Sequence, residues 1–322
     1  MKKNYKRILV TGGTGFIGNN LVKRLVQQGN AVSVFDDNSR GNLKRVKDMD
    51  IENYFKGDIR KKEDLLKIKN KFDIVYHLAF INGTENFYKF PEKVIDVGIK
   101  GIINVIDILI KNKKNLLMMA SSSEVYNLPK KIPTDENVEI LIPDIFNPRF
   151  SYGGTKFISE LITINYLRKN NSNFKIFRPH NVFGPDMGNE HVIPQLLKKV
   201  FFASTRKNSK ACNIKIQGSG NETRAFCYID DAVDQIIKIQ KHGKTNSIFN
   251  VGQNKEKSII DLIRDFEKIL DLKIKITKSN LKFGSTKRRC PNMKKTYRLS
   301  GNKNSYANGL KETIHWYSRE YK

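Results

Sequence analysis

Cysteines and long apolar runs are scarce in this chain. Its 322 residues contain three cysteines, Cys212, Cys227 and Cys290, whose number and spacing support neither a disulfide framework nor a CxxC metal pair. No apolar run reaches the roughly 18–20 residues that cross a bilayer. The basic N-terminus is followed only by a short apolar stretch, Ile8 to Val10, which is too brief for a signal-peptide core. We therefore expect a cytoplasmic protein without a membrane segment.

Acidic residues are also few, with 32 Asp and Glu against 59 Lys and Arg, a formal net charge of +27. Such an excess raises the question of nucleic acid. The lysines are scattered along the whole chain instead of forming a stripe, so we expect no nucleic-acid partner. The five histidines show no HExxH or similar spacing, so we expect no metal. The positive field would instead help to gather an anionic substrate.

Strand-like and helix-like segments alternate through the first half of the chain, which predicts an α/β fold: a Rossmann-type, doubly wound parallel sheet with a smaller C-terminal substrate-binding lobe. We expect residues 1–178 to form the NAD-binding domain, with segments near 225–250 returning to it, and residues 179–322 to form mainly the second lobe. The expected strands are Arg7–Val10, Ala31–Phe35, Tyr54–Phe55, Asp73–Leu78, Leu116–Ala120, Lys175–Phe177 and Ser247–Val251, and the expected helices include Phe16–Gln28, Pro91–Ile110, Tyr152–Leu167 and Asn304–Tyr321.

A glycine-rich turn lies between the first expected strand and the first expected helix. Gly12, Gly15 and Gly18 form GxxGxxG, which lets the backbone approach a pyrophosphate at a helix N-terminus. Asp36 ends the second strand about 20 residues further on, where a carboxylate binds the ribose 2′-hydroxyl of NAD. Arg40 could instead host the 2′-phosphate of NADP, but Asp36 favours NAD as the cofactor.

A tyrosine and a lysine form YxxxK at the start of a later expected helix. Tyr152 and Lys156 share one helical face, so the ammonium can lower the pKa of the phenol and prepare it for proton transfer. The segment Ser121–Tyr126 follows the fifth expected strand, at the sheet edge where ligands bind. A hydroxyl there could hydrogen-bond the reacting oxygen of a substrate.

Together with several further motifs, this pattern resembles the extended short-chain dehydrogenase/reductase family, in its nucleotide-sugar epimerase and dehydratase branch. The resemblance covers essentially the whole chain. The further motifs are Gly57-Asp58-Ile59-Arg60, Tyr76-His77-Leu78-Ala79, Arg178-Pro179-His180-Asn181-Val182-Phe183-Gly184-Pro185, Gly218-Ser219-Gly220, Thr223-Arg224-Ala225-Phe226 and Arg288-Arg289-Cys290-Pro291.

The resemblance implies roles for individual residues. Ser122 would assist Tyr152, and Lys156 would hold the nicotinamide ribose. Guanidinium groups bind phosphate oxygens in a fork, which suits arginines on a diphosphate. The resemblance also implies a homodimer whose interface is formed by the helix near Val94–Ile110 and the YxxxK helix. The implied cofactor contacts are Gly12, Gly15, Phe16, Ile17, Gly18, Asp36, Asn38, Asp58, Ile59, Leu78, Ala79, Tyr152 and Lys156, and the implied substrate contacts are Thr84, Glu85, Ser123, His180, Asn181, Arg224 and Arg289.

Members of this branch share an oxidation at the sugar C4 hydroxyl and then diverge, and the residues after Ser122 help to separate them. Dehydratases typically carry Asp-Glu there, whereas this chain has Ser123-Glu124, which also resembles the decarboxylase pattern. Glu124 is a candidate catalytic residue, with a purely structural carboxylate as the other interpretation. We favour an NAD-dependent nucleotide-sugar 4-epimerase from surface-polysaccharide synthesis. The alternatives are a C4 dehydrogenase, a uronate decarboxylase or 4,6-dehydratase and, remotely, a non-catalytic NAD(H)-binding regulator.

Three positions depart from the pattern of this branch. Gly98 stands where many relatives place an asparagine, and Asn127 follows Tyr126 in place of the usual glycine. His180 replaces a residue that is often aromatic, and either a second acid/base group or a packing residue would explain it. Thr84 and Glu85 follow the fourth expected strand and are candidates for sugar specificity.

Overall fold

The computed structural model describes residues 5–111, 115–205, 211–280 and 286–321. Its centre is a seven-stranded parallel sheet in the order β11-β6-β5-β4-β1-β2-β3, which confirms the Rossmann-type fold expected from the sequence. Its last outer strand comes from far along the chain and pairs in parallel with β6. The strands are β1 (Arg7–Thr11), β2 (Ala31–Asp36), β3 (Asn53–Lys56), β4 (Ile74–His77), β5 (Leu116–Ala120), β6 (Asn173–Pro179) and β11 (Ser247–Val251).

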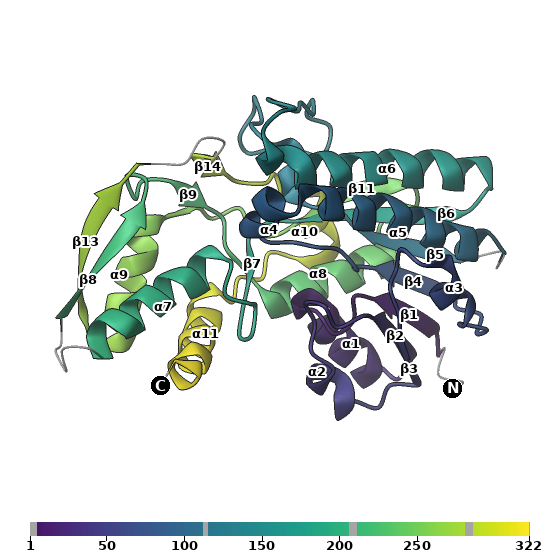
Figure 1. The fold of residues 1–322 in the computed structure, drawn as a ribbon, viewed down its shortest axis with the longest axis horizontal. Helices are drawn as coiled ribbons and strands as arrows, with labels where there is room; N and C mark the ends of the chain where they lie inside the picture. The colour runs from purple at the N-terminus through teal and green to yellow at the C-terminus, as the bar shows by residue number, and fades with distance from the viewer. Residues whose placement is uncertain (1–4, 112–114, 206–210, 281–285, 322) are drawn as a thin grey trace.

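Helices cover both faces of this sheet (Figure 1). Successive side chains of a strand point to opposite faces, so Ile8 and Val10 pack in one core cluster and Leu9 packs in the other. The first cluster contains α1 (Phe16–Gln27) and α8 (Ile229–His242), and the second contains α5 (Pro91–Lys111) and α6 (Ser151–Lys169). Strands buried on both faces explain the nearly continuous apolar segments in the sequence.

The second lobe shares the first core cluster instead of forming a separate one. Leu197 of α7 (Val192–Thr205), Phe266 of α9 (Ile259–Leu270) and Tyr317 of α11 (Tyr306–Glu320) all belong to it. The division at residue 178 therefore remains an interpretation of the sequence. In the described part of the chain no helix is long and apolar enough to span a membrane.

The remaining elements are short. The helices are α2 (Lys44–Lys47), α3 (Lys62–Leu66), α4 (Thr84–Lys89) and α10 (Lys294–Ser300), with 3-10 turns η1 (Ser123–Tyr126) and η2 (Pro148–Phe150). The strands β7 (Val182–Phe183) and β10 (Cys227–Tyr228) form one pair, β8 (Ala211–Gln217) and β13 (Lys273–Ser279) form another, and β12 (Lys257–Ser258), β9 (Thr223–Arg224) and β14 (Arg288–Arg289) form a three-stranded sheet.

Candidate active site

Two adjoining cavities lie at the carboxyl ends of the central strands. The larger, of about 330 Å³, runs from Gly12 past Tyr152 and Lys156 to Arg289. The smaller, of about 130 Å³, extends from Gly12 to Asp36 and Asp58. Crevices at this edge of doubly wound sheets are where ligands bind. Within the described ranges, no group of three or more His, Cys, Asp or Glu is placed to hold a metal ion.

The turn after β1 leaves the backbone bare where the two cavities meet. Gly12 has φ +73°, and a Cβ there would lie 2.6 Å from the backbone nitrogen of Ala79. A Cβ at Gly18 would lie 2.0 Å from the carbonyl oxygen of Gly12. The glycines therefore let α1 begin directly against the turn, with Gly15, Phe16 and Ile17 also lining the larger cavity. A helix N-terminus without side chains in the way fits the pyrophosphate of NAD.

Asp36 is held at the end of β2 by the backbone. Its two carboxylate oxygens accept hydrogen bonds from the amides of Thr14 at 3.0 Å and Asn38 at 2.8 Å. These bonds aim the carboxylate into the smaller cavity, as an adenosine ribose requires. Asn38 itself lies outside the cavity lining, where its side-chain amide donates to the Tyr54 hydroxyl at 2.6 Å. A cofactor contact from Asn38 therefore stays a prediction, which this placement disfavours.

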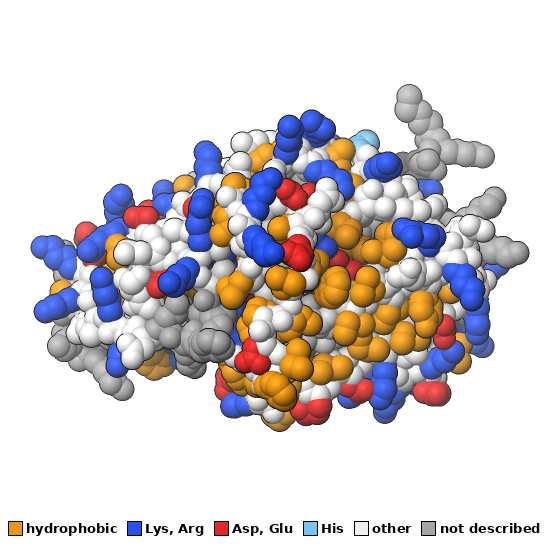
Figure 2. Space-filling model, turned by 90° about the horizontal axis from the view of Figure 1, so that it is seen from above, with side chains coloured by type: hydrophobic (Ala, Val, Ile, Leu, Met, Phe, Trp, Pro, Cys, Tyr) orange, Lys and Arg blue, Asp and Glu red, His pale blue; other side chains and the backbone are white. Residues whose placement is uncertain are grey.

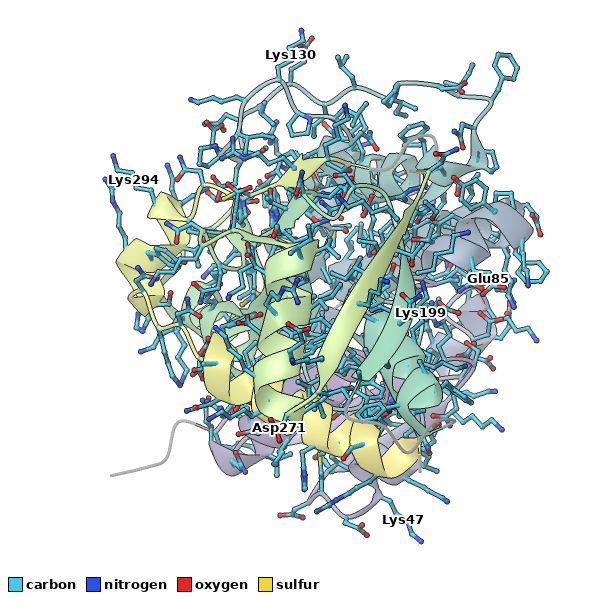
Figure 3. All side chains as sticks on the ribbon, turned by 90° about the vertical axis from the view of Figure 1, so that its left-hand side faces the viewer. Lys47, Glu85, Lys130, Lys199, Asp271 and Lys294 are labelled. Atoms are coloured by element: carbon cyan, nitrogen blue, oxygen red, sulfur yellow. The ribbon has the colours of Figure 1, made fainter. Side chains whose placement is uncertain are left out.

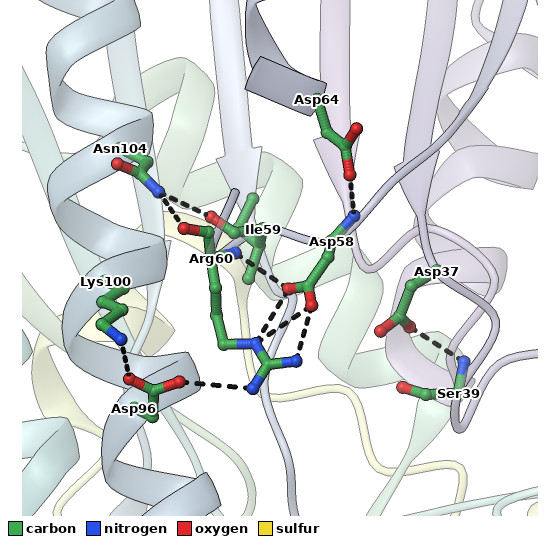
Figure 4. A network of polar contacts seen from close by, with 9 residues as sticks. All are labelled: Asp37, Ser39, Asp58, Ile59, Arg60, Asp64, Asp96, Lys100 and Asn104. Carbon is green, nitrogen blue, oxygen red and sulfur yellow. Dashed lines mark hydrogen bonds and ion pairs between the residues drawn. The ribbon is translucent and has the colours of Figure 1, made fainter. Parts of the chain in front are cut away.

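An ionic network closes the far end of the smaller cavity (Figure 4). The Arg60 guanidinium binds the Asp58 carboxylate with contacts of 2.6–3.1 Å and reaches Asp96 on α5 at 3.2 Å. Hydrogen bonding from Arg60 lowers the pKa of Asp58. Ile59, Leu78 and Ala79 line the same cavity, so these expected cofactor contacts are brought together with Asp58.

Two ion pairs join the segment after β2, which includes α2, to the loop after β7, and we call them the clasp. Arg45 binds Asp186 in a fork at 2.5 and 2.6 Å and donates to the carbonyl of Thr14 at 3.1 Å. Arg40 pairs with Glu190 at 3.0 Å. Arg40 and Arg45 line the larger cavity beside Gly12 and Gly15, so the clasp crosses the cofactor turn. Sequence analysis overlooked it because its partners are far apart in the chain.

The catalytic candidates Ser122, Tyr152 and Lys156 all line the larger cavity. Burial raises the pKa of Tyr152, and a hydrogen bond with Ser122 works in the opposite direction. The Lys156 ammonium donates to the Ala120 carbonyl at 2.7 Å, and burial lowers its pKa to about 7. Tyr152 is thus placed to take a proton from a hydroxyl, with the Lys156 ammonium nitrogen 6.0 Å from the centroid of its ring.

Aromatic rings enclose Tyr152 in a way that the sequence did not reveal. Phe87 of α4 stacks on the Tyr152 ring with centroids 4.7 Å apart, and Phe80 meets it edge-on at 5.2 Å. Both phenylalanines line the larger cavity. Helix α4 is too short for its periodicity to be recognised in the sequence, so only the structure places Phe87 here.

Glu124 lies at the substrate end of the cavity between two arginines. Its carboxylate accepts from Arg289 at 2.5 Å and from Arg149 at 3.0 Å. Burial alone would raise the pKa of Glu124, but the charges of Arg289 and Arg149 outweigh burial and lower it to about 2. The carboxylate is therefore ionised at neutral pH. Arg149 is a site residue that sequence analysis did not identify.

The other expected substrate residues are distributed unevenly. Ser123, Asn181 and Thr84 line the larger cavity, whereas His180, Arg224 and Glu85 lie outside its lining. His180 is buried, and burial lowers its pKa to about 3, so it stays neutral near pH 7. Its Nε2 lies 3.0 Å from the Asn250 side-chain oxygen. These features favour packing over acid/base work at His180.

Arg224 and Glu85 are turned to neighbours of their own. The Arg224 guanidinium donates to the carbonyls of Thr223 and Thr286, both at 2.7 Å. Glu85 lies on the exposed side of α4, where Figure 3 shows it at the rim of the molecule, and pairs with Lys89 at 2.5 Å. Substrate contacts from either residue stay predictions, which these placements disfavour.

The glycine turn, Asp36 and the Ser122–Tyr152–Lys156 set define an NAD-dependent enzyme that acts on a hydroxyl group. Residues 8–252 match the model of the NAD dependent epimerase/dehydratase family, and the chain belongs to that family. Its relatives include nucleotide-sugar epimerases, dehydratases and decarboxylases, and its structural neighbours include nucleotide-sugar epimerases.

Two relatives and one solved structure mark the range of similarity. A UDP-N-acetyl-alpha-D-glucosaminuronate decarboxylase of Bacillus cytotoxicus is 28% identical over 97% of this chain and 98% of its own length. A putative UDP-glucose 4-epimerase of Methanocaldococcus jannaschii is 31% identical over 79% of each chain. The structure of an epimerase from Methanothermobacter thermautotrophicus superposes with a TM-score of 0.87 and 25% identity, covering 99% of this chain and 94% of that one.

Proposed function

We propose that this protein oxidises C4 of a nucleotide-linked uronic acid and then removes its carboxyl group as carbon dioxide. The observation that carries the proposal is Glu124, ionised between Arg149 and Arg289 and preceded by Ser123 in place of an acid. The Bacillus cytotoxicus relative, which is similar over nearly the whole chain, is a decarboxylase of this kind. The 4-epimerase favoured by the sequence analysis is therefore not confirmed, and the decarboxylase alternative fits better.

The oxidation uses the three residues around the sugar C4. Tyr152 takes the proton from the C4 hydroxyl while Ser122 hydrogen-bonds the same oxygen. The positive charge of Lys156, on the next turn of α6, favours the phenolate that Tyr152 must become. Gly12, Gly15 and Gly18 would hold NAD, which would supply the hydride acceptor for this oxidation.

The second step needs little acid/base chemistry from the protein. A ketone at C4 makes the C6 carboxylate a β-keto acid, so the electrons of the breaking C5–C6 bond move onto the C4 oxygen. Tyr152 and Ser122 can hydrogen-bond the negative charge that develops there. Protonation of C5 and return of the hydride to C4, with Tyr152 giving back its proton, would then complete a net loss of carbon dioxide. Elimination of water from C5 and C6 would instead need a proton donor near C6, and the ionised Glu124 carboxylate cannot donate.

The cations at this end of the cavity suit a carboxylate on the sugar. Arg149 and Arg289 each carry more donors than one carboxylate occupies. A uronate adds a third anionic group to the two phosphates of a sugar nucleotide, and guanidinium forks bind carboxylates well. A neutral hexose, the substrate of a simple 4-epimerase, would offer these arginines no sugar carboxylate, so that they would face only Glu124 and the diphosphate.

The decisive experiment is mass spectrometry of sugar nucleotides after incubation with the purified protein and NAD. The panel contains UDP-glucuronate, UDP-N-acetylglucosaminuronate and the matching neutral sugars. We expect the acids to lose the mass of carbon dioxide and the neutral sugars to stay unchanged. A neutral sugar that keeps its mass but changes its retention time would establish a 4-epimerase instead, and loss of two hydrogens would establish a dehydrogenase.

A paired substitution then tests the role of Glu124. Glu124→Gln removes the charge that holds Arg149 and Arg289, so decarboxylation should fall strongly. Glu139→Gln is the matched control, because Glu139 is exposed and pairs only with Lys130 among the contacts described for it. Equal rates for both variants and the wild type would contradict the assignment of Glu124 to the site.

We also propose that the protein is a cytoplasmic homodimer. Large apolar side chains are exposed on α5, on α6 and next to them. Figure 2 views the molecule from above and shows hydrophobic side chains gathered from its centre to its right, the side on which α5 and α6 lie in Figure 1. Unpartnered apolar area of this kind often marks an interface. Leu161→Arg should convert a dimer to a monomer in analytical ultracentrifugation, and a monomeric wild type would refute the proposal. The exposed residues are Tyr88, Phe90, Ile95, Ile158, Leu161 and Tyr166.

A further inference from the structure

Phe80 touches both members of the catalytic pair. The Lys156 ammonium nitrogen lies 3.7 Å from the centroid of the Phe80 ring. The same ring meets Tyr152 edge-on at 90°, with centroids 5.2 Å apart. Phe80 also lines both cavities, at the point where the cofactor turn gives way to the catalytic residues.

The position of the Phe80 ring depends on a glycine in the neighbouring helix. A Cβ at Gly98 of α5 would lie 2.6 Å from two atoms of the Phe80 ring and 2.4 Å from the side chain of Thr155. Real side chains do not approach so closely, so any other residue at position 98 would displace the ring or α6. The absence of a side chain at Gly98 therefore leaves the space that the Phe80 ring occupies.

The remaining surroundings of Lys156 supply little charge. His77 on β4 is neutral near pH 7 because burial lowers its pKa to about 3. Glu160, on the same helix as Lys156, raises the Lys156 pKa through its charge, but it is bound in a fork to Arg178 at 2.6 and 2.8 Å. The Ala120 carbonyl of β5 accepts one ammonium proton at 2.7 Å, and Tyr152 shares the helix. A buried ammonium in such a setting gains from the negative face of an aromatic ring.

We propose that Phe80 is a positioning residue that keeps Lys156 protonated through a cation–π contact and fixes the Tyr152 ring, with Gly98 as its required partner. The inference rests on the proposed roles of Tyr152 and Lys156 and adds the group through which their geometry and charge are maintained. The charged form of Lys156 is the form that favours the Tyr152 phenolate. Removal of the ring should therefore narrow the pH range in which the pair works.

The test measures the pKa of Lys156 directly, by competitive labelling of the cofactor-free protein with acetic anhydride followed by peptide mass spectrometry. Phe80→Leu keeps an apolar side chain but removes the π face, so the Lys156 pKa should fall by roughly half a unit to one and a half units. Phe87→Leu is the matched control, because Phe87 stacks on Tyr152 but not on Lys156, and it should leave the Lys156 pKa unchanged.

The direction of the shift separates positioning from simple packing. If Phe80 only excluded water, its replacement would hydrate Lys156 and raise the pKa toward the ordinary value of a lysine. An unchanged or raised pKa in Phe80→Leu overturns the proposal. Gly98→Ala retains Phe80 but displaces its ring, so it should also lower the Lys156 pKa. An unchanged Lys156 pKa in Gly98→Ala overturns the inference that Phe80 requires Gly98.

Two further features keep the test decisive. Phe80→Met replaces Phe80→Leu if the leucine variant does not fold, as judged by circular dichroism, and the same downward shift is expected. The labelling needs no substrate, so it still answers if uronic acids are not decarboxylated and the proposed function fails. Conversely, a failure of the Phe80 proposal leaves the product analysis of the wild-type protein unaffected.

Discussion

At the cofactor end of the cavity the protein presents mainly backbone, whereas at the catalytic end it presents side chains. Gly12, Gly15 and Gly18 clear the path to the first turn of α1, and Asp36 is aimed by backbone amides. The catalytic end brings together residues from four segments: Phe80 and Phe87 after β4, Ser122 and Glu124 after β5, Arg149 with Tyr152 and Lys156 around the start of α6, and Arg289 from β14.

The difference teaches which part of the site is free to change. A cofactor site formed by backbone atoms leaves no space for added side-chain atoms, but it can bind the same dinucleotide whichever catalytic residues lie beside it. The catalytic end is made of side chains, so single substitutions can change the reaction that it supports. Ser123 in place of an acid is enough to remove a proton donor. The reaction is therefore decided at the end that is hardest to interpret from sequence.

Tyr152→Phe should have the largest effect on catalysis while leaving the cofactor end of the cavity unaffected. Loss of the hydroxyl removes the proton acceptor at C4, so turnover should fall by roughly 10²–10⁴-fold. NAD affinity, measured by isothermal titration calorimetry, should barely change because the cofactor turn is intact. A parallel loss of NAD affinity would mean that the two ends are not independent.

Gly18→Ala should do the reverse and damage the cofactor end. Its Cβ would lie 2.0 Å from the Gly12 carbonyl oxygen, so the turn must move. Strain of about 1–3 kcal/mol would weaken NAD binding by roughly fivefold to 150-fold. Gly154→Ala is the control, because a Cβ there meets only the end of the Ile142 side chain at 3.3 Å. Equal NAD affinity in the two variants would contradict a backbone-built seat.

Acid should weaken the protein through the buried histidine beneath the catalytic end. The folded-state pKa of His180 is lowered by burial to about 3 from an ordinary value of 6.5, so between these values the unfolded chain binds a proton that the folded chain does not. Stability is therefore lost as the pH falls below about 6.5, by about 1.4 kcal/mol per unit for this one group. Thermal unfolding at several pH values measures the slope.

A matched pair of variants assigns that slope to its source. His180→Gln should flatten the fall in Tm between pH 6.5 and pH 4, whereas His315→Gln, at an exposed position of α11, should leave it as in the wild type. His77 is also buried and His191 is partly buried, with pKa values lowered to about 3 and about 4, so part of the slope should survive. An identical slope in both variants would remove His180 from this account.

The smallest effect is expected from the clasp. Arg45→Ala removes the fork to Asp186, which is partly exposed, so NAD should dissociate roughly two- to fivefold faster. Stopped-flow displacement of NAD measures the rate. Arg264→Ala, whose partner Glu267 lies on the same helix α9, should have no effect on this rate. An unchanged NAD dissociation rate in Arg45→Ala would mean that the clasp does not slow NAD release and that the backbone contacts alone determine it.

The parts of the fold that could be predicted are those with local signals. Helices α1, α5 and α6 have at least twelve residues each, and β5 and β11 match the expected ranges residue for residue. Helices α2, α4 and α10 have seven residues or fewer and were missed, because so short a segment shows no clear periodicity. The glycine turn and Asp36 were accessible for the same local reason.

The parts of the site that escaped prediction depend on distant pairings. Arg149 and Arg289 meet Glu124 across 25 and 165 residues, and Arg45 meets Asp186 across 141. Glu85 shows the limit from the other side, since its neighbour Thr84 lines the cavity while Glu85 faces away. One residue along a helix turns a side chain by about 100°, so the outcome depends on where α4 begins.

The late arrival of β11 in the sheet has a consequence for synthesis on the ribosome. Strand β6 is complete at Pro179, but its outer neighbour ends only at Val251, so a nascent chain carries an open apolar edge while some seventy further residues are made. The cell would therefore handle this protein as a client of nascent-chain chaperones, and truncated translation products ending between these two strands would be prone to aggregate.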